Sequence, residues 1–154
     1  MMRQGLNSIL VPVNDSPHSE RAFRWACHVA RSNKAQLHTL HVIEVPLTLS
    51  LEAEITADVD RAEELLARYE RIAHEEKYRG LEAGCLRARQ AGAAIVREVE
   101  IKQAEMVVVG IPYNRTMRQC SMGSTASYIF QNSSCQVLLW RDTAPLLNPP
   151  GLHS

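Results

Sequence analysis

Neither sign of charge is in excess in this 154-residue sequence, because 17 Lys and Arg residues balance 17 Asp and Glu residues. General nucleic-acid binders depend on many Lys and Arg contacts with phosphates, so this balance argues against that class. Long apolar runs are also absent, and none approaches the roughly 20 residues needed to span a bilayer. The N-terminus lacks the apolar core and small-residue cleavage site of a signal peptide. We therefore expect a cytoplasmic protein with no membrane span in this chain.

Cysteine is scarce and scattered. The four cysteines are Cys27, Cys85, Cys120 and Cys135. They form no CxxC pair and show no spacing typical of metal ligands. A free cysteine behaves as a small apolar residue, so we expect buried or idle thiols and no metal site.

Short apolar runs alternate with segments of helical periodicity along the chain. We predict strands at 9–13, 37–45, 81–89, 106–109 and 137–140, and helices at 17–32, 51–80, 93–103 and 124–131. Such alternation is typical of a parallel sheet with helices on both faces. The sequence therefore predicts one α/β domain over residues 1–142. The Pro-rich tail at 143–154 is expected to order only against a neighbour.

The first predicted strand runs into a clear helix start. Ser16 is a natural N-cap, and Pro17 suits the first helical position. In doubly wound sheets, ligands bind at the carboxyl ends of strands where the strand order reverses. If the first and fourth strands are neighbours, Asn14 and Gly110 face each other across such a crevice.

The segment from Met106 to Thr125 carries the most informative pattern. It reads as a buried strand ending in Gly110, a loop, and a Gly123-Ser124 pair that opens a helix. The N-terminus of a helix offers unpaired N–H groups and the positive end of a dipole, so it can hold a phosphate. The loop also contains Arg115 and Arg118, and no Asp or Glu occurs from Met106 to Arg141. This pattern predicts an anion site, although a capped loop with solvated arginines would look the same.

These segments resemble the universal stress protein family. Val11 to Ser16 resembles the family's first strand and turn, and His41 to Glu44 resembles the end of its second strand. Gln136 to Arg141 resembles its closing strand. The resemblance covers about residues 7–141.

The glycines of the loop resemble the family's nucleotide motif, which runs Gly, two residues, Gly, nine residues, Gly, then Ser or Thr. Gly110, Gly123 and Ser124 stand at three of these positions, and Tyr113 stands at the middle glycine.

The resemblance implies an open five-stranded parallel sheet, doubly wound and adenine-nucleotide alpha-hydrolase-like. It also implies a homodimer formed through the last strand, Val137–Trp140, and ATP or AMP as the ligand, with Mg²⁺ where ATP binds. The residues implied at the nucleotide are Pro12, Val13 and Val42 at the adenine, Gly110, Gly123, Ser124 and Thr125 at the ribose and phosphates, and Asn14, Tyr113 and Asn114 beside them.

Two positions depart from the family's pattern. Binding members usually carry Asp where this chain has Asn14, and Asn both donates and accepts without a charge. Tyr113 replaces a glycine, and a left-handed backbone would cost a residue with a Cβ about 1–2 kcal/mol. Pro112 adds a fixed φ and has no N–H donor. We expect altered polar selection at Asn14, and a phosphate loop whose first half is compromised at Tyr113.

Other polar side chains have simpler interpretations. His38 and His41 are three apart on one strand and so point to opposite faces, which argues against a shared metal site. Ser16, His18 and Ser19 also resemble a nucleophile with its base. No third orienting group is evident, so we interpret them as polar residues of a first helical turn.

The sequence favours a regulatory, adenine-nucleotide-binding protein without catalytic residues. The alternative is a dimeric stress-response interaction module that no longer binds nucleotide, motivated by Tyr113 and Asn14. A slow ATP hydrolase is less well supported, because the GxxxxGK[ST] loop is missing. A phospho-acceptor domain is set aside, because the first turn lacks a tight acidic pair and no Lys follows the fifth strand.

Overall fold

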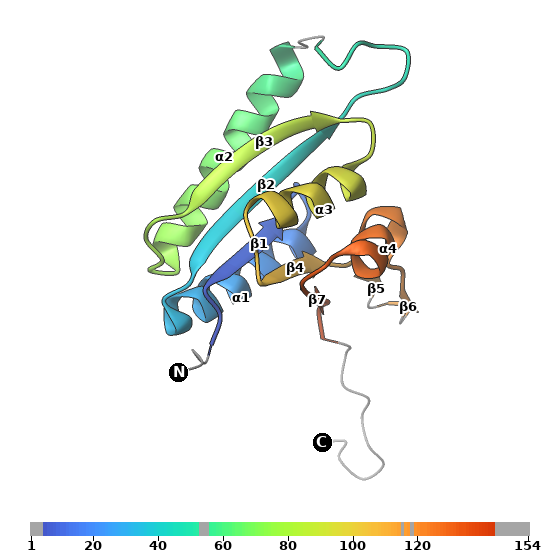
Figure 1. Cartoon of the computed structure of the whole chain (residues 1–154). Helices are drawn as coiled ribbons and strands as arrows, with labels where there is room; N and C mark the ends of the chain where they lie inside the picture. Colours follow the sequence, from blue (N-terminus) through green and yellow to red (C-terminus); the bar gives the residue numbers. More distant parts are fainter. Residues whose placement is uncertain (1–4, 53–55, 115, 118, 144–154) are drawn as a thin grey trace.

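A five-stranded parallel sheet forms the centre of the molecule (Figure 1). The computed structural model describes residues 5–52, 56–114, 116–117 and 119–143. The strands of this sheet are β1 (Ser8–Pro12), β2 (Gln36–Glu44), β3 (Glu82–Ala88), β4 (Met106–Gly110) and β7 (Gln136–Trp140). All four of its strand pairings are parallel, which confirms the predicted fold class. Residues 144–154, most of the predicted tail, lie outside the described residues.

The strand order is β3-β2-β1-β4-β7. The chain builds outward from β1 to β3 and then crosses back, so that β4 pairs with the free side of β1, with Ile9 opposite Met106. The expectation that the first and fourth strands are neighbours is confirmed. Between their carboxyl ends the strand order reverses, which is where open α/β sheets bind ligands.

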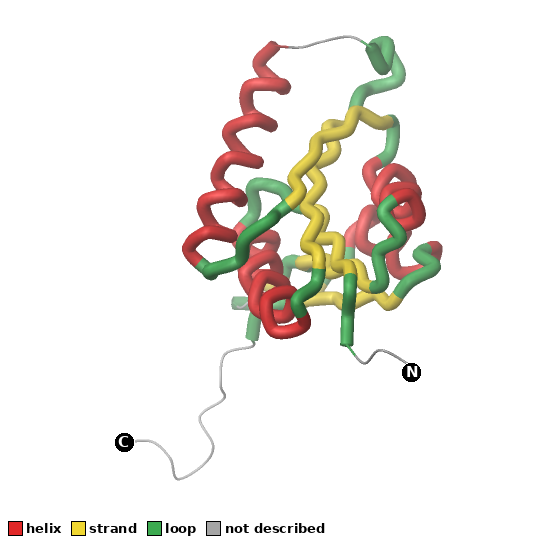
Figure 2. The backbone as a smooth tube through the Cα atoms, turned by 60° about the vertical axis from the view of Figure 1, so that its left-hand side comes forward, coloured by secondary structure: helices red, strands yellow, loops and turns green. Residues whose placement is uncertain are grey.

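Two helices cover each face of the sheet (Figure 2). They are α1 (Pro17–Asn33) and α2 (Thr56–Glu75) on one face, and α3 (Ala91–Ile101) and α4 (Gly123–Asn132) on the other. Successive side chains of a strand point to opposite faces of the sheet. In β1, Ile9 and Val11 therefore join the core under α1 and α2, while Leu10 joins the core under α3 and α4. Among the described residues, no helix combines the length and apolarity needed to cross a membrane.

Helix α1 begins as the sequence predicts. Ser16 is the N-cap with an extended backbone, its hydroxyl accepts a hydrogen bond from the Ser19 N–H, and Pro17 is the first helical residue. This cap uses one of the N–H groups that a helix start leaves without a partner.

Three helices end in the same way, without a glycine. A left-handed residue follows each helix directly or after one further residue: Lys34, Lys77 and Gln103, with φ of 54°, 60° and 53°. After α2, the Tyr78 N–H donates to the Ala73 carbonyl (2.9 Å) and the Lys77 N–H donates to the His74 carbonyl (3.0 Å), which is the Schellman pattern. The residue that follows the left-handed one is buried in every case: Ala35, Tyr78 and Ala104.

Helix α2 is shorter than the predicted helix at 51–80. Leu51 and Glu52 lie in a turn, where the Ser50 hydroxyl accepts from the Glu52 N–H (3.2 Å), a local bond that competes with helix formation. Residues 53–55 lie outside the described residues. At the other end, the left-handed Lys77 stops the helix before Gly80. Glycine is unfavourable inside a strand, yet β3 runs through Gly84 without interruption.

Gly110 allows α1 to approach β4 closely. A Cβ at this position would lie 2.5 Å from the His18 carbonyl oxygen and 3.1 Å from the Ala22 Cβ. The φ of Gly110 is not in the left-handed region, so the glycine is required by packing and not by backbone conformation.

We therefore expect Gly110→Ala to lower the free energy of unfolding by about 1–3 kcal/mol, because the added methyl group forces α1 away from the sheet. Gly84→Ala on β3 is the matched control, since nothing lies within 4 Å of its Cβ position. The control is expected to change the unfolding free energy by less than about 1 kcal/mol. Urea denaturation of both variants measures the difference, and equal effects would contradict the packing role of Gly110.

Candidate functional site

A crevice of about 410 Å³ lies at the reversal of strand order. Its walls come from the carboxyl ends of β1, β2 and β4, the start of α1, the N-terminal half of α3, and α4. Eight of the ten residues expected at a nucleotide line it: Pro12, Val13, Asn14, Val42, Gly110, Gly123, Ser124 and Thr125. The lining also includes residues that the sequence did not single out for this role: His18, Ser19, Leu40, His41, Glu44, Ala91, Ile95, Val109, Pro112, Met122, Ala126 and Ile129.

The crevice has an apolar end and a polar end. Pro12, Val13 and Val42 line it where β1 and β2 finish, and Ile95 of α3 contributes a further apolar wall. A crevice of this size with mainly apolar walls and a few polar groups is typical of small-molecule sites.

The first turn of α4 supplies the polar end. Its N-cap residue, Met122, has a helical backbone and gives no side-chain cap, and the first turn contains no acidic residue. Gly123 has φ of 74°, and nothing lies within 4 Å of its Cβ position. Because no side chain of the described residues caps this turn, the backbone N–H groups of Gly123, Ser124 and Thr125 are available to bind an anion.

Tyr113 and Asn114 are not among the residues that line the crevice. They form β5 (Tyr113–Asn114), which pairs in antiparallel fashion with β6 (Gln119–Cys120). The Tyr113 ring lies under the guanidinium of Arg141, 4.3 Å from its centroid. The expected left-handed strain at Tyr113 is wrong, because the backbone there is extended and φ is not positive.

The loop places Pro112 in the crevice and turns Tyr113 towards the end of β7. The Asn114 side chain accepts from the Met117 N–H (2.9 Å) and so serves the turn of its own hairpin. The bulk of Tyr113 therefore does not fill the crevice. Arg115 and Arg118, which the sequence placed near an anion, lie outside the described residues.

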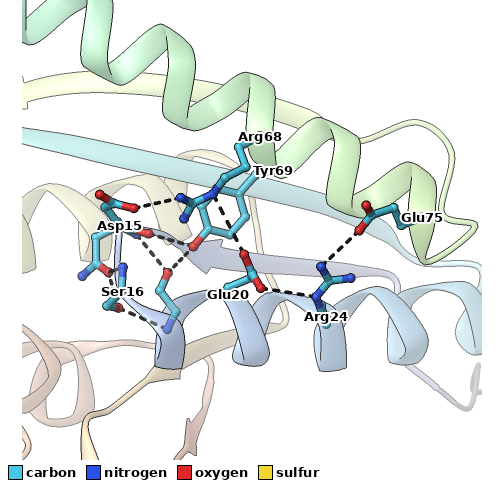
Figure 3. A network of polar contacts seen from close by, with 9 residues as sticks. Asp15, Ser16, Glu20, Arg24, Arg68, Tyr69 and Glu75 are labelled. Atoms are coloured by element: carbon cyan, nitrogen blue, oxygen red, sulfur yellow. Dashed lines mark hydrogen bonds and ion pairs between the residues drawn. The ribbon is translucent and has the colours of Figure 1, made fainter.

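Three hydrogen bonds hold the backbone of Asn14 in a closed ring (Figure 3). The Asn14 N–H donates to the Ser19 hydroxyl (2.9 Å), and the Tyr69 phenol donates to the Asn14 carbonyl (2.7 Å). Since a carbonyl can only accept, the phenol proton is committed there and the Ser19 hydroxyl donates to the phenol oxygen (2.9 Å). Tyr69 is fully buried and meets Phe23 edge to face at 5.0 Å, so the ring is anchored in the core.

The side chain of Asn14 is oriented by Ser16. Its Oδ1 accepts from the Ser16 N–H (3.0 Å) and also from the Ser16 hydroxyl. Both donors require an acceptor, so the amide orientation follows from the network. The Nδ2 group of Asn14 is left as the donor that can serve a ligand.

Ser16 and His18 are in contact, but not as a nucleophile and its base. Burial lowers the pKa of His18, which favours the neutral ring. The Ser16 hydroxyl proton is given to Asn14, so the His18 Nε2 at 3.0 Å donates to the Ser16 oxygen. Ser16 does not line the crevice, and its hydroxyl oxygen caps α1. The contact therefore supports the cap.

A chain of ion pairs connects α1 with α2 beside the same turn (Figure 3). Arg68 donates to Asp15 (2.9 Å) and lies 4.0 Å from Glu20, and Arg24 bridges Glu20 (3.6 Å) and Glu75 (3.1 Å). These groups are partly exposed, and such pairs each contribute roughly 0–1 kcal/mol. The ion pairs align α2 with α1, while the buried Tyr69 side chain anchors α2 in the core.

His38 and His41 lie on opposite faces of β2, as the sequence predicts. His38 is close to Glu82 of β3 (2.9 Å), whereas His41 lines the crevice and its Nδ1 bonds the Val13 carbonyl (2.9 Å). A second cavity, of about 560 Å³, adjoins the crevice beneath α2 and shares His41, Val42 and Glu44 with it. Within the described residues, no three His, Cys, Asp or Glu side chains are grouped closely enough to hold a metal ion.

Comparison with known proteins gives one consistent result. Residues 5–141 match the model of the universal stress protein family. A universal stress protein of Methanocaldococcus jannaschii is 24% identical over 155 residues, covering 90% of this chain and 86% of that protein.

Two solved structures share the fold. The universal stress protein from Archaeoglobus fulgidus, solved in complex with dAMP, is 21% identical with a TM-score of 0.69, over 86% of this chain and 96% of that chain. A universal stress protein family protein from Arabidopsis thaliana, solved with AMP bound, is 22% identical with a TM-score of 0.65, over 95% and 98%. At these identities the likeness establishes the fold alone.

The ring around Asn14 gives a test of how the crevice is held. Tyr69→Phe removes the phenol that donates to the Asn14 carbonyl, so we expect the free energy of unfolding to fall by about 1–2 kcal/mol. Tyr128→Phe on α4 is the control, because Tyr128 is 39% exposed and no hydrogen bond of its hydroxyl is found among the described residues. Thermal and urea unfolding measure both variants. An unchanged stability of Tyr69→Phe would show that the ring does not stabilise the turn.

Proposed function

This chain belongs to the universal stress protein family, and on that premise we propose that it binds an adenine nucleotide, ATP or AMP, in the crevice between β1 and β4. Binding is regulatory in this proposal, and no residue is assigned a catalytic role. The observation that carries the proposal is the uncapped first turn of α4, which opens onto the crevice.

The two ends of the crevice suit the two ends of a nucleotide. A phosphate at Gly123, Ser124 and Thr125 meets free N–H groups and the positive end of the α4 dipole. The apolar walls of Pro12, Val13 and Val42 suit a purine ring at the other end. Two relatives of the same fold were solved with dAMP and AMP, which supports an adenine nucleotide here.

Mg²⁺ enters the proposal only together with ATP. The residues that would hold an ATP-bound ion are not assigned, since Glu44 is the only carboxylate among the described residues that line the crevice, and it lies at the end of β2. A bound ion would therefore be held chiefly by the phosphates and by water.

The direct test is to identify what the purified protein carries and what it binds. Mass spectrometry of the ligand released by denaturation is expected to find AMP or ATP. Either nucleotide at millimolar concentration, the latter with magnesium, is expected to raise the melting temperature, because it binds the folded state only. If no nucleotide is released and no thermal shift is seen, the dimeric interaction module becomes the better description.

The phosphate end can be tested by adding one negative charge. We expect Ser124→Asp to weaken AMP binding at least about tenfold, because the new carboxylate occupies and repels the phosphate site. The fold should be retained, since a carboxylate is favourable in the first turn of a helix. Ser134→Asp is the control, because it adds the same charge beyond the other end of α4. Calorimetric titration measures both, and unchanged binding by Ser124→Asp would contradict this placement of the phosphate.

We also propose that the protein is a homodimer formed through β7. β7 is an edge strand of the sheet, and its four apolar residues, Val137, Leu138, Leu139 and Trp140, are half-buried. Phe130 of α4, the helix that precedes β7 in the chain, is a further apolar residue and is 57% exposed. An edge strand with exposed apolar residues is a ready surface for pairing with a second copy. The cytoplasmic location expected from the sequence stays a prediction.

Sedimentation equilibrium tests the dimer. The unchanged protein is expected at twice its chain mass of 17.3 kDa. Val137→Lys is expected to shift the mass to that of the monomer, because a charged side chain on an edge strand opposes pairing. Ala83→Lys places the same charge on β3, the opposite edge of the sheet, and should leave the dimer intact. Dissociation by Ala83→Lys in place of Val137→Lys would move the interface to β3.

A further inference from the structure

A groove of about 520 Å³ lies between α2 and the edge strand β3. Figure 1 shows α2 beside β2 and β3. The groove is lined by residues of α2, β2, β3 and the loop after β2: Ile43, Leu51, Val59, Ala62, Glu63, Leu66, Cys85, Leu86 and Arg87. None of these residues lines the crevice at β1 and β4, so the groove is a separate site.

The register of the sheet determines which side chains form the floor of the groove. Leu37 of β2 belongs to the core under α1 and α2, and Ile43, an even number of residues later, points to the same face. Ile43 is paired with Arg87 of β3, and His41 is paired with Cys85. The side chains of Cys85 and Arg87 therefore also point to the face that carries α2.

Helix α2 supplies the wall opposite the strands. Val59, Ala62 and Leu66 are three and four residues apart, so they lie on one side of the helix. Ala62 is buried, but Val59 and Leu66 are only half-buried, and Cys85 on β3 is exposed. The apolar side of α2 thus extends past the core and faces an open groove.

The loop after β2 adds a further apolar wall. Leu51 lines the groove and is 42% exposed. Arg89, just beyond the end of β3, donates to the carbonyls of Pro46 (2.5 Å) and Leu49 (2.7 Å) and so ties this loop to β3. The groove is therefore bordered by a loop that the protein itself holds in place.

The chemistry of the lining suits an alkyl chain. Among the described residues that line the groove, none is aromatic, and the two charged ones, Glu63 and Arg87, are exposed at its edge. Partial burial raises the pKa of the Cys85 thiol, so the neutral thiol adds to the apolar surface. A nucleobase needs polar partners along its edge, whereas an alkyl chain needs only apolar contact.

Arg87 places a positive charge beside the floor of the groove. It also lines a small neighbouring cavity together with Asp58, but Asp58 is bonded to Arg61. Among the ion pairs between described residues, none includes Arg87. A guanidinium group can bind a carboxylate through two parallel hydrogen bonds. Arg87 is therefore suited to an anionic head group.

We propose that this groove binds the anion of a free fatty acid, with the alkyl chain along Val59, Ala62 and Leu66 and the carboxylate at Arg87. The proposal goes beyond nucleotide binding and does not depend on it. From Val59 to Leu66 the helix rises about 10 Å, which suits a chain of medium length. Glu63 also lines the groove, so an amphiphile with a cationic head is the competing ligand.

Calorimetric titration of the unchanged protein tests the chain and the head group separately. Decanoate is expected to bind at least tenfold more tightly than butyrate, because the longer chain buries more apolar surface. It is also expected to bind about fivefold more tightly than decanol, which lacks the charge. Absence of decanoate binding, or tighter binding of decyltrimethylammonium than of decanoate, would overturn the proposal.

A charge placed inside the groove tests its location. Cys85→Glu is expected to weaken decanoate binding at least tenfold, because the new carboxylate lies among the apolar walls and repels the head group. Ala83→Glu is the matched control, since it adds the same charge on the same face of β3 but outside the lining. Both residues are exposed, so the fold should be retained. Equal effects of the two substitutions would place decanoate elsewhere and refute the site.

Removal of the Arg87 charge tests the head group. Arg87→Gln is expected to lower the affinity for decanoate to that for decanol, while decanol binding changes by less than about twofold. Arg97→Gln removes the same charge from α3 on the opposite face of the sheet and should leave both affinities unchanged. A decanoate-to-decanol ratio preserved in Arg87→Gln would contradict the proposal. None of these outcomes bears on nucleotide binding in the crevice.

Discussion

The closed ring of Asn14, Ser19 and Tyr69 is the interaction on which the site depends. It lies where β1 ends and α1 begins, so one turn must finish a buried strand, start a helix and form a wall of the crevice. In this turn the Asn14 N–H donates to the Ser19 hydroxyl, and the Asn14 carbonyl accepts from the phenol of Tyr69, a fully buried residue of α2. The helix that lies farthest from the phosphate end of the crevice therefore sets the position of the turn, while the surface ion pairs between α1 and α2 add alignment with little stability.

Most of the fold could be predicted from the sequence because its local signals agree with one another. Buried Val and Ile runs gave β1 and β4, and Ser16-Pro17 gave the start of α1. The end of α2 could not be predicted in this way, because Lys77 takes a left-handed conformation that usually marks glycine. Burial of the next residue, Tyr78, compensates for that cost, and burial depends on the tertiary structure.

The sequence could predict which residues meet at the candidate site, but not the contacts that their atoms make there. The glycine spacing placed Gly110 and Gly123 together, yet one is required for helix packing and the other for a left-handed backbone in open space. Tyr113 was expected to strain the loop, but the β5–β6 hairpin and the stacking with Arg141 carry it away from the crevice. In the sequence, His41 was considered only as a metal ligand together with His38, and that site was argued against. The structure instead bonds the His41 Nδ1 to the Val13 carbonyl, a contact that no sequence pattern reveals.

The pairing of β1 with β4 joins parts of the chain that are far apart in sequence. Ile9 pairs with Met106, so the centre of the sheet closes only after the whole segment that contains β2 and β3 has been made and folded aside. Contacts of such long separation form slowly, because the entropy of closing the intervening loop must be lost first. The crevice spans this same junction. Neither half of the chain forms the crevice by itself. Any molecule bound there holds together the two segments whose association completes folding.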